Sequence, residues 1–236
     1  MRKTTDLDGV RSVALAFLHL PIEETEMYPI VIMHPIFESA FISTKIDGKF
    51  TVINITESDE NLQKAKTIWE DNIKRCDTLV QVYSLIRKSY RLTFLKFVEQ
   101  YLSKQDMSEM LADAWVSSEN PNQDTNCSLA LLTRWFKKAD KKALMTEEDY
   151  VVYDSLEPEF KVYRGVAVGR NPHGLSWTMN YKKAEWFANR FNTPDKKGYV
   201  QEVTITKAEA LAYFNTRDEQ EVVVDTAKIK SKIQKV

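Results

Sequence analysis

Residues 217–225 read RDEQEVVVD and place two glutamates, Glu219 and Glu221, just before a run of three valines. In an extended segment, side chains at positions i and i+2 point the same way, so both carboxylates are expected on one face. The valine-rich run itself is typical of a strand. The stretch predicts a strand whose two leading carboxylates either converge on one substrate or form a solvated strand start.

The residues before this strand, as far back as Pro158, also follow a pattern typical of short strands. Short β-like runs are separated by glycine and proline, and one amphipathic helical pattern, YKKAEWFANRF at 181–191, interrupts them. The β-like runs are KVYRGVAV (161–168), GLSWTM (174–179), GYVQEVTIT (198–206) and EVVVD (221–225). The sequence predicts the α+β class, with a mostly helical region at 1–155 and a mainly stranded core at 156–236.

Two features of the first 155 residues depart from the helical pattern. Asp47-Gly48 lies between two β-rich runs and predicts a hairpin near residues 41–55. In the loop SSENPNQDTN (117–126), Asn122, Asp124 and Asn126 alternate as in a calcium loop, but the glycine and closing glutamate of an EF-hand are missing. We expect this loop to form a hydrogen-bonded turn that caps a helix beginning near Cys127.

The composition excludes several classes of partner. The formal net charge is −1 and charges of both signs are interspersed, which argues against nucleic acid as a partner. No apolar stretch reaches the roughly 20 residues that cross a bilayer. Cys76 and Cys127 lie outside any CxxC or Cys/His cluster, so we expect neither a zinc site nor a disulfide framework. A reducing, cytoplasmic location fits this pattern.

Three pieces of the stranded region carry polar groups suited to chemistry. Arg164 shares a strand face with apolar neighbours, so its guanidinium is expected to be buried, where it needs an anion. Ser176 and Thr178 project from one face of the next strand. Glu219 and Glu221 complete the set. Each piece alone also fits an ordinary structural role: an internal ion pair, a cross-strand polar pair or a solvated strand start.

The order of these pieces resembles the arginine-serine-glutamate class of mono-ADP-ribosyltransferases over residues 160–225. That family has an arginine strand, an S-T-S strand and an E-x-E motif, which here are Arg164, Ser176-Trp177-Thr178 and Glu219-Gln220-Glu221. The departure is in S-T-S, because tryptophan and threonine take its second and third positions. The resemblance implies a compact split β-sandwich that follows a helical lobe.

The resemblance also implies a substrate and a role for each motif residue. NAD would be the substrate, with Arg164 on the diphosphate side and Ser176 holding Glu221, which would stabilise the ribose cation. Glu219 would orient an arginine of a target protein and accept its proton. The residues expected to contact NAD are Arg164, Gly165, Ser176, Trp177, Thr178 and Phe187. The aromatic that stacks on nicotinamide stays open among Trp177, Tyr181, Trp186 and Phe187.

Two other functions stay open at this point. An NAD glycohydrolase would use water as the acceptor and release free ADP-ribose. A non-catalytic binding module would neither bind nor consume NAD. The expected setting is a bacterial toxin or phage effector that acts in the cytoplasm, including the cytosol of a host.

Overall fold

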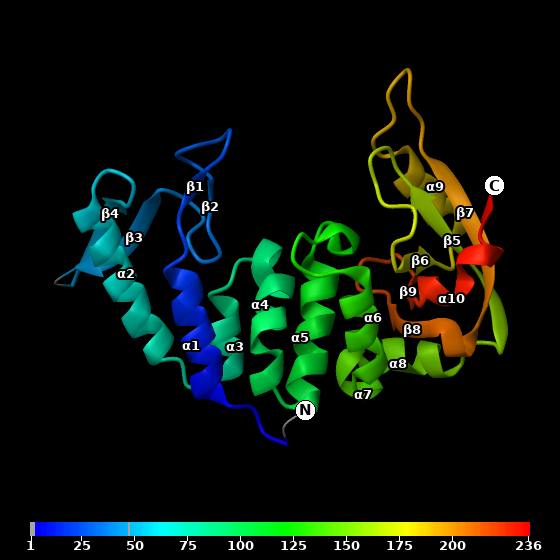
Figure 1. The fold of residues 1–236 in the computed structure, drawn as a ribbon, viewed down its shortest axis with the longest axis horizontal. Coiled ribbons are helices and arrows are strands. Elements are labelled where there is room, and N and C mark those ends of the chain that lie inside the picture. The colour runs from blue at the N-terminus through cyan, green and yellow to red at the C-terminus, as the bar shows by residue number, and fades with distance from the viewer. Residues whose placement is uncertain (1–2, 47) are drawn as a thin grey trace. The chain divides into compact units, whose positions relative to one another are not determined.

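The computed structural model describes residues 3–46 and 48–236. Its composition is 46% helical and 20% strand, which confirms the predicted α+β class. The backbone separates into two compact units, Met1–Ser103 and Lys104–Val236, drawn in Figure 1. Among the residues described, no helix has both the length and the apolar character needed to cross a membrane.

The boundary between these units differs from the position expected from the sequence. The change from helical to stranded texture at residues 155/156 predicted a boundary there, whereas the compact units divide between Ser103 and Lys104. The reason is that α5–α8 belong with the strands: α6 and α8 both contact β8 (Figure 1). A change in the sequence pattern from helix to strand shows where the helices end, but it does not show where one compact unit ends and the next begins.

Unit 1 consists of short helices and two small antiparallel ribbons. The predicted hairpin is present as β3 and β4, and Gly48 has the left-handed φ of 77° that its turn requires. Asp47 lies outside the described residues. The elements are α1 (Leu7–Leu18), β1 (Glu23–Glu24), β2 (Ile32–Met33), β3 (Phe41–Ile46), β4 (Lys49–Asn54), α2 (Asp59–Lys74), α3 (Leu79–Ser84), η1 (Lys88–Tyr90), α4 (Arg91–Val98) and η2 (Glu99–Tyr101).

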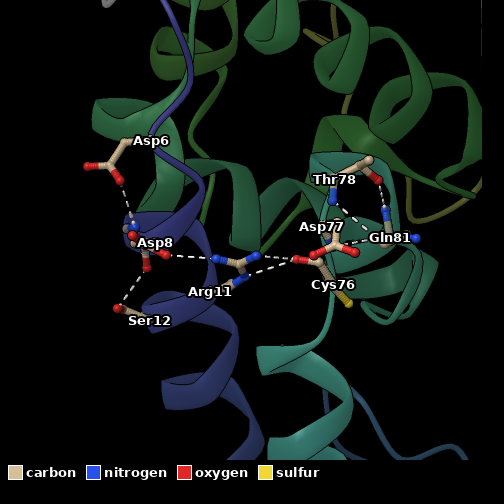
Figure 2. Close-up of polar contacts among 9 residues, drawn as sticks. Asp6, Asp8, Arg11, Ser12, Cys76, Asp77, Thr78 and Gln81 are labelled. Atoms are coloured by element: carbon tan, nitrogen blue, oxygen red, sulfur yellow. Dashed lines mark hydrogen bonds and ion pairs between the residues drawn. The ribbon is translucent and has the colours of Figure 1, made fainter.

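Polar contacts join the first helix of unit 1 to the connection between α2 and α3 (Figure 2). Arg11 of α1 donates from Nε to the carbonyl oxygen of Cys76 at 3.0 Å and pairs through Nη1 with Asp8 at 2.7 Å. Thr78 and Gln81 form a capping box at the start of α3. These contacts fix where α2 ends and α3 begins.

Unit 2 begins with four α-helices and continues with a sheet. Its elements are α5 (Lys104–Ser117), η3 (Pro121–Gln123), α6 (Leu129–Lys138), α7 (Lys141–Leu144), α8 (Glu147–Asp154), β5 (Glu159–Val166), β6 (Ser176–Thr178), α9 (Tyr181–Asn189), β7 (Tyr199–Thr206), η4 (Lys207–Glu209), β8 (Ala210–Phe214), β9 (Glu221–Val224), α10 (Thr226–Ile229), η5 (Lys230–Lys232) and β10 (Gln234–Lys235). The four predicted β-like runs correspond to β5, β6, β7 and β9.

The strands of unit 2 pair into one six-stranded sheet in the order β10-β7-β5-β6-β9-β8. Every neighbouring pair is antiparallel. The short strand β6 lies between β5, which carries Arg164, and β9, which begins at Glu221. The sheet order therefore brings the three predicted motifs onto adjacent strands.

Helix α9 packs closely on β5, as Figure 1 shows. A Cβ atom at Gly165 would lie 2.1 Å from the carbonyl oxygen of Ala184 and 2.6 Å from the amide nitrogen of Ala188. Only glycine permits this approach, because real side chains do not tolerate such distances. Gly165 thereby brings the helix, including Phe187, against the strand that carries Arg164.

Candidate active site

The register between β6 and β9 places the serine, the threonine and the second glutamate of the predicted motifs on one face. Thr178 pairs with Glu221, and Ser176 pairs with Val223. Paired residues on neighbouring strands project from the same face, and alternation puts Ser176 there with Thr178. Trp177 projects from the opposite face with its partner Val222. The register therefore brings Ser176, Thr178 and Glu221 onto one face of the sheet.

Glu221 is a buried carboxylate with two hydrogen-bond donors. Trp115 Nε1, from α5, donates to Oε1 at 3.0 Å, and the Ser176 hydroxyl also bonds to the carboxylate. Glu221 is 8% exposed and Trp115 is 1% exposed. Burial raises the pKa of the Glu221 carboxyl, while the bonds from Ser176 and Trp115 oppose that rise. The site holds a carboxylate away from water and stabilises its charge with donors.

Asn122 orients the serine that contacts this carboxylate. Its Nδ2 donates to Ser176 Oγ at 2.9 Å, and its Oδ1 accepts from the amide nitrogen of Leu175. Because Ser176 Oγ accepts from Asn122, its own hydroxyl proton is available for Glu221. The sequence did not single out Asn122 for this role, since it stood in a loop considered only as a turn or a calcium site.

The rest of that loop forms the expected turn. Asp124 Oδ1 accepts from the amide nitrogens of Asn126 and Cys127, each at 2.8 Å. The helix that follows, α6, begins after its N-cap Ser128, whose side chain accepts from the amide of Leu131. The turn interpretation is therefore confirmed.

Arg164 is buried, as its apolar neighbours on the strand predicted. It is 8% exposed, and its Nη1 and Nη2 donate to the carbonyl oxygens of Ser176 and Asn171, at 2.5 and 2.8 Å. Among the described residues, its buried Nε has no hydrogen-bond partner. Burial lowers the pKa of Arg164 to about 10, which the nearby charge of Glu221 opposes, so the guanidinium stays cationic at neutral pH. Its observed partners are backbone carbonyls, and its contact with NAD stays a prediction.

Gly174 allows the side chains of Arg164 and Asn122 to approach its backbone closely. A Cβ atom there would lie 2.3 Å from Arg164 Nη2 and 2.8 Å from the Asn122 amide carbon. Any side chain at this position would push apart the two residues that hold Ser176 by its backbone and by its hydroxyl. The glycine is thus part of the support of the site.

Glu219 lies in a turn before β9, which differs from the expected extended pair. Gln220 has a φ of 47° and Asp218 a φ of 54°, so the chain is left-handed on both sides of Glu219. The prediction that positions 219 and 221 share one extended segment is wrong, because the intervening residue is not extended. Thr178 Oγ1 donates to the Glu219 carbonyl at 2.6 Å and so joins the turn to β6.

The turn nevertheless directs Glu219 into the same cleft as Glu221. Its carboxylate Oε1 is 3.4 Å from Arg217 Nε, and its side chain is 20% exposed. Glu219 is therefore the more accessible of the two carboxylates, and Glu221 is the one enclosed by protein donors.

All of the predicted site residues line one cleft of unit 2. Its empty volume is about 860 Å³, including the part open to solvent. Its lining consists of Trp115, Ser118, Glu119, Asn120, Pro121, Asn122, Tyr163, Arg164, Gly165, Ala167, Arg170, Ser176, Trp177, Thr178, Phe187, Arg190, Phe191, Arg217, Glu219 and Glu221. Trp115 and residues 118–122, which lie outside the predicted core at 156–236, form one part of the wall.

The cleft also contains two arginines that the sequence did not single out. The guanidinium carbons of Arg170 and Arg190 lie 5.1 and 5.2 Å from the ring centroid of Phe191. Across the described chain, neither arginine has a carboxylate within ion-pair distance. Stacking on the ring orients the guanidinium groups without neutralising them. They are available to an anionic ligand.

The four candidate stacking aromatics have different surroundings. Trp177 is 2% exposed and its Nε1 donates to the Gly174 carbonyl, so little of its ring is free for stacking. Tyr181 and Trp186 are exposed and lie outside the lining of the cleft. Phe187 is half-buried and lines it. Of the four, Phe187 has the position that stacking on a ligand requires.

No protein-family model, curated protein or solved structure matches this chain.

Proposed function

We propose that this protein cleaves NAD at the nicotinamide–ribose bond and transfers ADP-ribose to an arginine side chain of a target protein. The observation that carries the proposal is the buried Glu221 carboxylate, held by Trp115 and Ser176 in the cleft that also contains Glu219. In this proposal the sheet with α5–α9 is the catalytic core of an ADP-ribosyltransferase of the arginine-serine-glutamate class.

The first step is heterolysis of the glycosidic bond. The bonding electron pair stays on the nicotinamide nitrogen, which leaves as a neutral ring, so no general acid is required. Positive charge develops on the ribose C1′ and its ring oxygen, and a fixed carboxylate nearby stabilises that charge. Glu221 suits this role because its donors hold it in place before the substrate binds.

The second step is attack by the acceptor. A terminal guanidino nitrogen of the target arginine forms the new bond to C1′, and the proton that it loses goes to the Glu219 carboxylate. An arginine is a poor nucleophile until an acceptor orients it and takes that proton. The greater exposure of Glu219 supports its assignment to the acceptor and the assignment of Glu221 to bond cleavage, since an acceptor protein has to reach Glu219 from solvent.

Recognition of the rest of NAD would come from the arginines and Phe187. The unpaired guanidinium groups of Arg170 and Arg190 suit the two charges of the diphosphate, since the arginine fork binds phosphate oxygens in pairs. Phe187 would stack on nicotinamide. Arg164 would act chiefly by holding the backbone of Ser176.

The test is to incubate the protein with labelled NAD, first with a cell lysate and then with agmatine as a small guanidino acceptor. We expect transfer to both, and loss of NAD cleavage in Glu221→Gln. Glu219→Gln keeps the shape of the side chain but removes the proton acceptor, so transfer should fall by about 10²-fold or more while hydrolysis persists.

Each contrary result would change the proposal in a different way. Release of free ADP-ribose without labelling of any acceptor would indicate an NAD glycohydrolase. Failure to bind or consume NAD would indicate a non-catalytic binding module. Parallel loss of transfer and hydrolysis in Glu219→Gln would mean that both carboxylates serve NAD cleavage.

A further inference from the structure

A second hollow of unit 2 shares part of its lining with the cleft. Phe187, Arg217 and Glu219 belong to both, and the empty volume of the second hollow is about 890 Å³, including the part open to solvent. Its other lining residues lie at the start of α9, and they are Asn180, Lys182, Lys183 and Trp186. None of these four lines the cleft. This hollow, which we name the α9 groove, therefore has the proposed proton acceptor Glu219 in common with the proposed NAD site.

Contacts within α9 and between α9 and the turn hold the walls of the α9 groove. Asn180 Oδ1 accepts from the amide nitrogens of Lys182 and Lys183 at 3.0 and 3.3 Å, which fixes the start of the helix. Lys183 Nζ pairs with Asp218 Oδ2 at 3.2 Å and so joins the helix to the turn. The groove is therefore a feature of the folded chain before any ligand binds.

The charges that line the α9 groove are mostly positive. Among the described residues that line it, Lys182, Lys183 and Arg217 are cationic and Glu219 is the one carboxylate. Lys183 pairs with Asp218 and Arg217 pairs with Glu219. Lys182, by contrast, has no carboxylate within ion-pair distance in the part of the chain that the structure describes. The groove therefore complements an occupant that combines one positive group with several negative ones.

Trp186 adds an exposed aromatic surface to the α9 groove. It is 57% exposed, and the guanidinium carbon of Arg190 lies 5.6 Å from its ring centroid. Tryptophan is the aromatic side chain that binds guanidinium groups most strongly, and the methylene stem of an arginine also packs on such a ring. A tryptophan together with the Glu219 carboxylate suits the side chain of an arginine.

We propose that the α9 groove binds the segment of the target protein around the acceptor arginine and selects segments with acidic residues beside that arginine. The inference rests on the proposed function. The acceptor guanidinium reaches Glu219, while its methylene stem packs on Trp186. Acidic neighbours of the arginine pair with Lys182 and, in exchange for Asp218, with Lys183. Such an exchange is easy because exposed ion pairs are individually weak.

The experiment is a competition between two peptides in one reaction with the full-length chain and labelled NAD. Each peptide has a single arginine, flanked by aspartates in one peptide and by lysines in the other. At equal concentrations and low conversion, the ratio of the two products measured by mass spectrometry is the ratio of their kcat/KM values. We expect the aspartate peptide to be favoured about 5-fold or more, the scale of an exposed ion pair. The ratio is independent of the folded fraction, because both peptides compete for the same enzyme.

Substitution of Lys182 tests whether the groove is the source of this preference. Lys182→Glu should lower the ratio about 5-fold or more, and Lys182→Gln should give a value between those of Lys182→Glu and the parent. Lys196→Glu is the matched control, because Lys196 is an exposed lysine after α9 that does not line the groove. Its ratio should equal that of the parent. The preference of the parent should also shrink at about 1 M salt, where exposed charges are screened.

The contrary outcomes separate this inference from the proposed function. If both peptides are modified but Lys182→Glu keeps the parent's ratio, the inference is overturned and the transferase stands. If the label goes to added single-stranded DNA and to neither peptide, the cationic groove serves a nucleic acid and the inference is likewise overturned. If the protein does not consume NAD, the proposed function fails and the inference fails with it.

Discussion

Trp115→Phe tests whether the indole N–H keeps Glu221 in its charged form. The substitution removes the donor at 3.0 Å but leaves an aromatic ring in the buried site. A hydrogen bond to a charged group contributes about 1.5–3 kcal/mol, and 1.36 kcal/mol corresponds to a tenfold change. Its loss raises the pKa of Glu221 further above the ordinary range. We expect NAD cleavage near neutral pH to fall about 10- to 100-fold.

The assay is the rate of NAD consumption as a function of pH, because a merely structural role would not move the profile. The acidic limb of Trp115→Phe should shift to higher pH, with activity regained in alkali as Glu221 ionises. Trp135→Phe is the matched control: Trp135 is a buried tryptophan of the same unit, and its Nε1 has no partner among the described residues. Its profile should keep the shape of the parent's.

One result would refute this reasoning about Trp115. If the Trp115→Phe profile superimposes on that of the parent after correction for the folded fraction, the indole N–H does not tune Glu221. Its contact would then be only a packing contact, and the charge of the carboxylate would depend on Ser176 and on the nearby charges of Arg217 and Glu219.

Three further substitutions test other parts of the site. Glu221→Gln should raise Tm at neutral pH, because burial raises the pKa of that carboxyl and the folded state then carries a costly charge; the gain should shrink as pH falls toward 4.5, and a gain independent of pH would contradict the account. Arg164→Met should destabilise the chain in urea unfolding by about 1–3 kcal/mol for each carbonyl that it leaves unpaired, whereas Arg170→Met should be nearly neutral. Calorimetric titration of an Arg170→Gln/Arg190→Gln double variant should give affinity for ADP-ribose lowered about 10- to 100-fold with nicotinamide affinity unchanged; equal losses for both ligands would contradict a diphosphate role.

The sequence was sufficient for the strand motifs because their spacing alone determines which face a side chain takes. Alternation placed Ser176 and Thr178 together, and the apolar neighbours of Arg164 predicted its burial. The same rule failed at Glu219, since a single left-handed residue, Gln220, ends the extended geometry on which it depends. The alternation of side chains along a strand does not predict where such a left-handed residue will interrupt it.

The contribution of the helical segment could not be predicted in this way. Periodicity indicates which face of α5 is buried, but not that Trp115 would meet a carboxylate of β9, 106 residues along the chain. Asn122 likewise stood in a polar loop whose spacing favoured a turn, and its contacts with Leu175 and Ser176 depend on the packing of that loop against β6. Contacts between distant segments have no signature in a single sequence.

The turn around Glu219 has a consequence for how this chain could diverge. Its hydrogen bonds come from backbone groups of residues 218–220 and from the side chains of Asn215 and Thr178, so none of them depends on the Glu219 carboxylate. Glu221, by contrast, is bound to Trp115 and Ser176 through its side chain. If the proposed function holds, a descendant could exchange residue 219, and with it the preferred acceptor, without changing the contacts that hold Glu221. In a mutational scan for folding, position 219 should tolerate many residues, whereas positions 115 and 174 should tolerate few.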